Sequence, residues 1–193
     1  MKIRKTTLFF LFLLFVFVVC AIFFSIQLEP GIVPDEPEHF IISKQYAISW
    51  GVPADTQETY QFGPMKGRAF LYYWLNGRAI NILNFFSPLS TDLFMLIALR
   101  LLSVFYATLA VIFCYLLAES ILKSGWWALF VVFLLTNTLM FVFLAGGLTY
   151  DTLTNLFCFS GIYFWARSLS GKTFITNSLG WLICISAGTL TKF

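Results

Sequence analysis

The residues of this sequence that are best suited to chemistry lie close together, between Pro34 and Phe40. Three carboxylates and the only histidine of the chain fall within that stretch, at Asp35, Glu36, Glu38 and His39. Grouped carboxylates bind a cation, or an ionised one within hydrogen-bond reach of a hydroxyl takes its proton as a general base. Asp35 is the first candidate for that base, with Glu36, Glu38 and His39 supplying hydrogen bonds and charge around it.

A second acidic site lies much later in the chain, at Asp151 within the stretch from Gly146 to Asn155. Arg100 is a third candidate, because it stands inside an apolar segment that is long enough to cross a membrane. An intramembrane arginine is costly and tends to face protein or a polar cavity. In such a cavity Arg100 would hold a phosphate through charge-assisted hydrogen bonds.

Each of these residues also has a purely structural interpretation. Asp35 followed by Glu38 forms an Asp-x-x-Glu pattern, which is typical of a capped helix N-terminus. Asp151 would cap a helix in the same way at the start of a membrane span. Arg100 would extend its guanidinium outward to the polar membrane surface instead of binding a ligand. The residue types alone leave these alternatives open.

The composition indicates the class of protein that positions these residues. Of the 193 residues, 60% are hydrophobic and 11% are charged, whereas a soluble domain carries about 45–50% apolar and about 25% charged residues. Such a chain has too little polar surface to cover a water-soluble globule, so we expect an all-α integral membrane protein. A net charge of +3, without an extended run of Lys and Arg, excludes a nucleic-acid partner.

Five apolar segments, taken with their flanks, are predicted to cross the membrane as helices. The first is uncharged from Leu8 to Ile26 and would form about 30 Å of helix. It is too long, and too poor in small residues at its end, to be a cleaved signal peptide. The predicted spans cover residues 8–27, 93–118, 126–146, 152–167 and 178–193, and a long loop covers residues 28–92.

The charges of the short loops predict the orientation. Short loops rich in Lys and Arg stay on the cytoplasmic side. This rule places the N-terminus on the cytoplasmic side of the cytoplasmic (inner) membrane. Glu119 is then the one acidic residue on that side. The loop 28–92 and the turn at Asp151 then both face outside, so the two acidic sites meet the same face. The basic residues on the inner side are Lys2, Arg4, Lys5, Lys123, Arg167 and Lys172.

The outer loop is expected to form amphipathic helices that lie on the membrane. One helix is predicted over residues 39–50, ended by Gly51 and Pro53. Another is predicted over residues 69–86, where apolar residues recur at the spacing of a helix with one apolar face. Such helices settle in the membrane interface, where aromatic rings like that of Trp74 also collect.

The order of these features resembles a known class of membrane enzymes. A basic N-terminus, a first span and an outer loop opening with Pro-Asp-Glu-Pro-Glu-His-Phe (residues 34–40) are similar to the multi-span glycosyltransferases of the GT-C fold class. Within that class the sequence is closest to the bacterial dolichyl-phosphate-mannose-protein mannosyltransferase-like group. The stretch from Tyr150 to Asn155 matches the place of a second acidic motif in these enzymes. The stretch from Gly188 to Phe193 resembles a recurrent end of a later span.

The resemblance implies transfer of a sugar from a polyprenyl-phosphate carrier to a glycan, lipid or protein acceptor at the outer face of a bacterial inner membrane. It implies that Asp35 is the general base or orients the acceptor and that Glu36 supports it. Asp151 would shape the site or, with Asp35, help to hold a divalent cation (Mg or Mn) in members that use one. A nearby cation such as Arg100, or a metal, would stabilise the leaving phosphate. The residues expected to bind substrate are Asp151, Arg100, His39 and Glu38.

The sequence departs from that class in carrying fewer spans. We therefore expect it to be the N-terminal part of a larger transferase, with the acidic half of the active site and no activity alone. A non-enzymatic alternative stays open, namely a polytopic transport or assembly subunit with Asp35 and Asp151 at a cation or substrate entrance. An inactive homologue that binds a partner through its loop helices is a third hypothesis.

Overall fold

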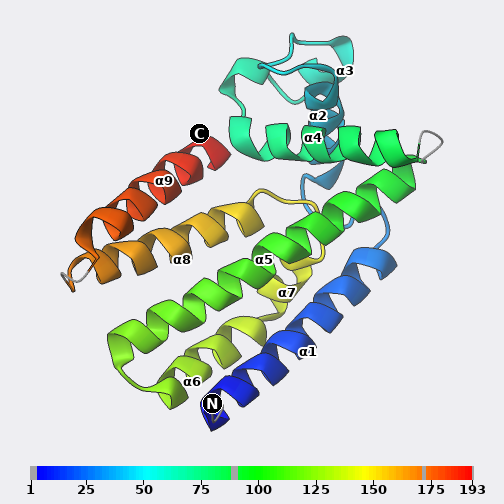
Figure 1. Cartoon of the computed structure of the whole chain (residues 1–193). Helices are drawn as coiled ribbons and strands as arrows, with labels where there is room; N and C mark the ends of the chain where they lie inside the picture. The colour runs from blue at the N-terminus through cyan, green and yellow to red at the C-terminus, as the bar shows by residue number, and fades with distance from the viewer. Residues whose placement is uncertain (1–3, 88–90, 171–172, 193) are drawn as a thin grey trace.

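Helices make up all of the regular structure in the computed structural model, which describes residues 4–87, 91–170 and 173–192. The expected all-α class is confirmed for these residues. Lys2 and Lys172 of the predicted orientation, and Phe193 of the last predicted span, lie outside them. The elements, in Figure 1, are α1 Lys5–Gln27, α2 Glu36–Ile48, α3 Gln57–Tyr60, the 3-10 turn η1 Met65–Gly67, α4 Phe70–Phe86, α5 Asp92–Leu122, α6 Gly125–Thr136, α7 Leu139–Ala145, α8 Asp151–Ser168 and α9 Phe174–Lys192.

Several of these helices are suited to a membrane. α1, α5 and α9 are each long and apolar enough to cross one, and a fourth span results if the bent pair α6 and α7 is counted as one. The chain is therefore an all-helical protein with three or four candidate spans in its described part. α8 occupies the predicted span 152–167 and has 18 residues, but it is not apolar enough to count as a candidate span, so the count of five stays a prediction.

The segment predicted to span the membrane over residues 126–146 is broken in the middle. α6 and α7 meet at 70°, and the break falls at three successive polar residues, Thr136, Asn137 and Thr138. Their side chains donate to backbone oxygens four residues earlier, at 2.9, 2.8 and 2.9 Å. Side-chain bonds of this kind compete with the helical ladder and bend helices. The break thus has a local cause in the sequence.

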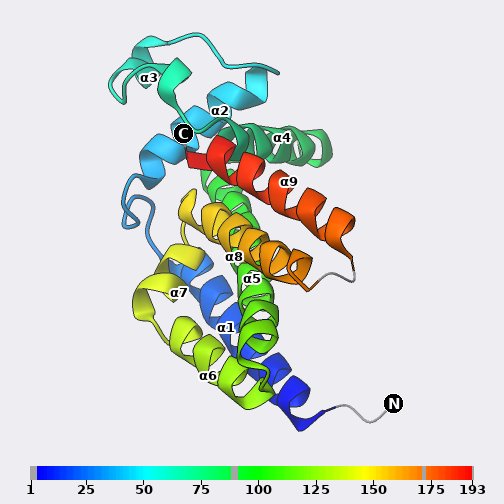
Figure 2. The same cartoon turned by 90° about the vertical axis from the view of Figure 1, so that its left-hand side faces the viewer.

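α5 is the central helix of the bundle. α8 packs along one side of it, while α1 and α6 pack along another, as Figures 1 and 2 show from two directions. α9 lies against α8 and also contacts α4. Two apolar clusters result: one joins α1, α5, α6 and α7, and the other joins α2, α4, α5 and α8. Because α5 contributes to both, it connects the bundle to the helices of the outer loop.

The loop over residues 28–92 folds around two crossing helices, α2 and α4, close to the two that the sequence predicts. α2 begins at Glu36 instead of residue 39, because Pro37 fits the first turn of a helix. α4 agrees with the predicted range 69–86. A Cβ added at Gly77 of α4 would lie 2.6 Å from the backbone carbonyl carbon of Tyr46 in α2, so the crossing requires glycine. The placement of these helices in the membrane interface stays a prediction.

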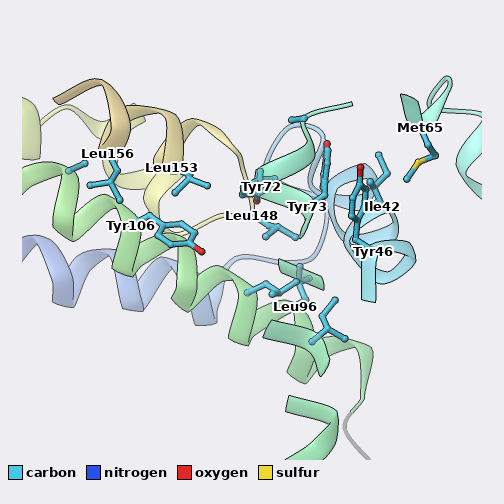
Figure 3. Packing of buried hydrophobic residues seen from close by; sticks show 14 residues of the cluster. Ile42, Tyr46, Met65, Tyr72, Tyr73, Leu96, Tyr106, Leu148, Leu153 and Leu156 are labelled. Carbon is cyan, nitrogen blue, oxygen red and sulfur yellow. The ribbon is translucent and has the colours of Figure 1, made fainter. Parts of the chain in front are cut away.

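A row of buried side chains joins the outer helices to the start of α8. Tyr46 of α2 and Tyr72 and Tyr73 of α4 are almost fully buried, and they share one cluster with Leu148 and Leu153. Figure 3 shows this row continuing from α2 and α4 toward α8. The packing fixes the first turn of α2, which carries the acidic motif, relative to the turn that precedes α8.

Candidate functional site

A buried ion pair between Glu36 and Arg100 forms the base of the site. Arg100 Nε donates to Glu36 Oε1 at 2.8 Å, and Arg100 Nη2 donates to Oε2 at 2.6 Å. The backbone N–H groups of Gly31 and Leu148 donate to the same carboxylate at 3.0 and 3.1 Å. A bidentate pair of this geometry is both strong and directional. Glu36 therefore ties α5 to the loop after α1 and to the turn before α8.

Arg100 is saturated by these and three further bonds. Its Nη1 donates to the backbone oxygens of Ser25 and Leu28 at 3.1 and 2.7 Å, and its Nη2 donates to that of Glu29 at 3.3 Å. A guanidinium has five N–H donors, and all five are used. Arg100 is also fully buried, so it faces protein and does not extend to the membrane surface. No N–H is left for the phosphate that we expected it to hold; Arg100 instead binds the carbonyls at the end of α1.

The partners of Glu36 keep it ionised. Burial alone would raise its pKa, but the hydrogen bonds from Arg100, Gly31 and Leu148 hold the pKa of Glu36 below its ordinary value. A saturated carboxylate of this kind is a poor group for exchanging protons with a substrate. The expected support of Asp35 by Glu36 is thus positional in this geometry: Glu36 fixes the backbone on which Asp35 stands.

Asp35 has the opposite environment. It is exposed, its φ of 60° puts it in the left-handed region, and its side chain makes no capping bond although it occupies the N-cap position of α2. Within the described residues its carboxylate has no hydrogen-bond or ion-pair partner. The capping interpretation is therefore wrong for Asp35, and Glu38 forms an ion pair with Arg68 instead of completing a capping box. Left-handed non-glycine residues are strained and concentrate at functional sites.

Two glycines pack the second acidic turn closely, Gly146 against α1 and Gly147 against the first acidic turn. A Cβ added at Gly146 would lie 2.6 Å from Phe24 Cβ of α1, and one added at Gly147 would lie 2.6 Å from Val33 Cγ2, in the turn that carries Asp35. Only glycine allows so close an approach at either position. Asp35 and Asp151 therefore belong to turns in direct contact.

His39 lies between the two acidic turns. Its Nδ1 is hydrogen-bonded to Tyr73 Oη at 2.8 Å, and its ring meets that of Tyr150 edge-on with centroids 5.2 Å apart. Burial lowers the pKa of His39 to about 4, although the charges of Asp35 and Asp151 oppose that shift. His39 is thus neutral near pH 7. Its Nε2 makes no hydrogen bond within the part of the chain that the structure describes.

Asp151 is the first residue of α8 and forms an ion pair with Lys192, the last residue of α9. Its Oδ1 lies 3.8 Å from Lys192 Nζ, and Thr149 Oγ1 donates to its Oδ2 at 3.4 Å. The N-cap residue of α8 is Tyr150, and Asp151 stands in the first turn, where the helix dipole favours a negative charge. Lys192 Nζ also lies 5.5 Å from the Tyr150 ring centre.

Sequence reasoning did not assign Tyr73, Tyr150 or Lys192 to the site. Tyr150 and Lys192 stood in the two stretches that resemble family motifs, which was the available signal for them. Tyr73 had none, because only the crossing of α2 and α4 brings it to His39. The predicted members Asp35, Glu36, His39, Asp151 and Arg100 do come together, the last as part of the base. Glu38 lies at the edge with Arg68.

The described residues offer no metal centre. Among them, no group of three or more His, Cys, Asp or Glu side chains is placed to hold an ion. Mg²⁺ is commonly held by one or two carboxylates together with waters and substrate phosphate, so Asp35 and Asp151 are the residues that would hold one. The proposed reaction routes no step through a metal ion.

Comparison with known protein families, with curated proteins and with solved structures finds no match to this chain. The function is therefore argued from the geometry of the site, together with the resemblance of its motifs.

Proposed function

We propose that this membrane protein transfers a sugar from a polyprenyl-phosphate carrier to a hydroxyl acceptor at the outer face of a bacterial cytoplasmic membrane, with Asp35 as the general base. One observation carries the proposal: an exposed, unpartnered carboxylate is fixed in a left-handed turn by a buried, saturated ion pair. A reactive group needs this combination, since its position must be fixed while its oxygens stay free.

The reaction uses Asp35 to remove one proton. The acceptor O–H gives its proton to the Asp35 carboxylate while the acceptor oxygen bonds to the anomeric carbon of the sugar. The bond between that carbon and the phosphate oxygen breaks, and the polyprenyl phosphate leaves with the electron pair. A glycan, lipid or protein hydroxyl satisfies this scheme equally. Asp35 then returns its proton to water.

The neighbours of Asp35 support this role. His39 is neutral, so it does not draw the Asp35 carboxylate into an ion pair. Its Nε2 remains for a hydrogen bond to a sugar or acceptor hydroxyl. The charge of the leaving phosphate needs a cation, and Arg100 has no donor to give. Within the described residues Lys192 has one long ion pair, with Asp151, and it takes this place in the proposal.

Replacing Asp35 tests the proposal directly. We expect Asp35→Asn to lower transfer from polyprenyl-phosphate-linked mannose or glucose by about a hundredfold or more, in membranes that contain the chain as part of the larger transferase that the resemblance implies. Asp92→Asn is the matched control, because Asp92 is also exposed and forms only a surface ion pair with Lys44. Full activity of Asp35→Asn would overturn the role of Asp35, and no wild-type transfer with any such donor would overturn the activity.

A second candidate function, transport, is favoured by the broken pair α6 and α7. Many transporters bind their substrate at helices interrupted within the membrane, and the break at Asn137 exposes polar groups in an apolar segment. Flux into vesicles reconstituted with the protein separates the two functions. A transporter would lose flux in Asn137→Leu, whereas the transferase would keep transfer in Asn137→Leu and lose it in Asp35→Asn.

A further inference from the structure

A groove of about 340 Å³ runs between α8 and α9. Its walls are apolar, with Phe157 and Ile162 from α8 and Trp181 and Ile185 from α9. Lys192 is the one charged residue that lines it among the described residues. An apolar groove with one cation at its end is complementary to a long hydrocarbon chain that carries an anionic group.

Glycines let the two helices approach closely along this groove. Gly161 and Gly188 both line it, and a Cβ added at Gly188 would lie 3.3 Å from Phe157 Cβ. Ile162 and Ile185 are each 46% exposed. The groove therefore opens sideways between α8 and α9, of which α9 is a candidate span, and a lipid chain reaches it from the side without unfolding the bundle.

Lys192 is available to a phosphate. Its side chain is 45% exposed, and the distance of 3.8 Å to Asp151 lies at the outer limit of an ion pair. Exposed pairs of this kind contribute little, so a phosphate can compete with Asp151 for the ammonium group. The sugar-bearing phosphate is a diester with one negative charge, whereas the polyprenyl phosphate released by transfer is a monoester with more charge, so the attraction to Lys192 grows as the leaving group departs.

The position of Lys192 links the groove to the site. Lys192 lies over the Tyr150 ring, and Tyr150 lies edge-on to His39, one helical turn from Asp35. We propose that the α8–α9 groove binds the isoprenoid chain of a polyprenyl phosphate and that Lys192 binds its phosphate. This assignment rests on the proposed function and names the place of its donor. The sugar on that phosphate then projects toward His39 and Asp35.

Photolabelling tests the groove without requiring turnover. The full chain is placed in phosphatidylcholine nanodiscs, labelled with a benzophenone-bearing farnesyl phosphate, and the labelled residues are mapped by mass spectrometry. We expect labels on α8 and α9, with competition by unlabelled farnesyl phosphate. Ile185→Trp, which fills the groove, should lower labelling about tenfold. Ile183→Trp is the matched control, since Ile183 is exposed on the same helix and does not line the groove.

The headgroup is tested by charge. We expect Lys192→Gln to weaken farnesyl phosphate binding about tenfold, which is the size of a lost charge-assisted hydrogen bond, and to leave farnesol binding unchanged. Lys44→Gln, at another exposed lysine with a carboxylate partner, should change neither. Thr189→Trp offers a second way to fill the groove if Ile185→Trp does not fold.

Three results would overturn the assignment: equal competition by inorganic phosphate, which indicates a free-anion site; equal competition by phosphatidylglycerol, which indicates ordinary bilayer lipid; and equal loss in Ile183→Trp. The transfer assay is independent of these. Transfer that needs Asp35, with labels elsewhere, would leave the proposed function standing and remove the groove. Labels in the groove of a protein that shows no transfer would support the groove as a lipid site and overturn the proposed function.

Discussion

Two neighbouring carboxylates of this protein, Asp35 and Glu36, have opposite surroundings. Glu36 is 1% exposed and is held by Arg100 and two backbone N–H groups. Asp35 is exposed and, within the described residues, its carboxylate has no such partner. The same contrast holds for the cations: Arg100 uses every donor inside the protein, and Lys192 keeps a single long ion pair. Residue type and spacing are therefore less informative here than the number of bonds that each charge already makes.

The contrast has a physical cause. A buried charge must be fully hydrogen-bonded, because leaving it unpaired in a medium of low polarity costs several kcal/mol. An exposed charge is solvated by water and can exchange water for a substrate. We therefore call Glu36 with Arg100 the closed pair and Asp35, Asp151 and Lys192 the open rim. We expect substitutions in the closed pair to change mainly the stability of the protein and substitutions in the open rim to change mainly transfer.

Removing one partner of the closed pair should have the largest effect. Arg100→Met leaves the Glu36 carboxylate buried without its cation, and we expect the free energy of unfolding to fall by about 3–5 kcal/mol. Thermal unfolding in detergent, followed by helical circular dichroism, measures it. The double variant Arg100→Met with Glu36→Leu should recover part of the loss, because both charges are then gone. A single variant as stable as the wild type would show that the pair does not hold the turns together.

His39 should make stability depend on pH. Its pKa is about 4 in the folded protein and about 6.5 when unfolded, so the unfolded state binds the proton more readily. Stability is then complete above about pH 6.5 and falls by about 3 kcal/mol as the pH drops toward 4. His39→Gln should flatten this part of the profile. A wild-type profile that is flat between pH 6.5 and 4.5 would contradict the burial of a neutral His39 among Asp35, Asp151, Glu36 and Arg68.

The contact between the two acidic turns gives an effect of intermediate size. In Gly147→Ala the new methyl group would lie 2.6 Å from Val33 Cγ2, and overpacking of this kind costs about 1–3 kcal/mol. Val33→Ala in the same chain should relieve the contact and restore part of the stability. The shift also moves Asp35 relative to Asp151. We therefore expect the rate of transfer to fall even at temperatures where Gly147→Ala remains folded. Unchanged transfer in Gly147→Ala would mean that the two acidic turns do not act together.

The sequence predicts the positions of the helices well, but it predicts poorly which groups pair with the charged side chains. The range 69–86 agrees with α4 because its apolar period is strong and local. The saturation of Arg100 and the exposure of Lys192 were not predictable, because they depend on backbone oxygens at the end of α1 and on the packing of α9 against α8. The break at Asn137 had a local signal in three polar residues, but hydrophobicity averaged over the segment conceals it.

The smallest effect on stability is expected at the open rim. Lys192→Gln removes an ion pair whose side chains are 45% and 41% exposed, and such pairs contribute about 0–1 kcal/mol. We therefore expect an unfolding midpoint close to that of the wild type, together with a clear loss of transfer in the assay used for Asp35. A loss of stability as large as that of Arg100→Met would place Lys192 with the closed pair. Its role would then be to hold α9 against α8, and the phosphate would need another cation.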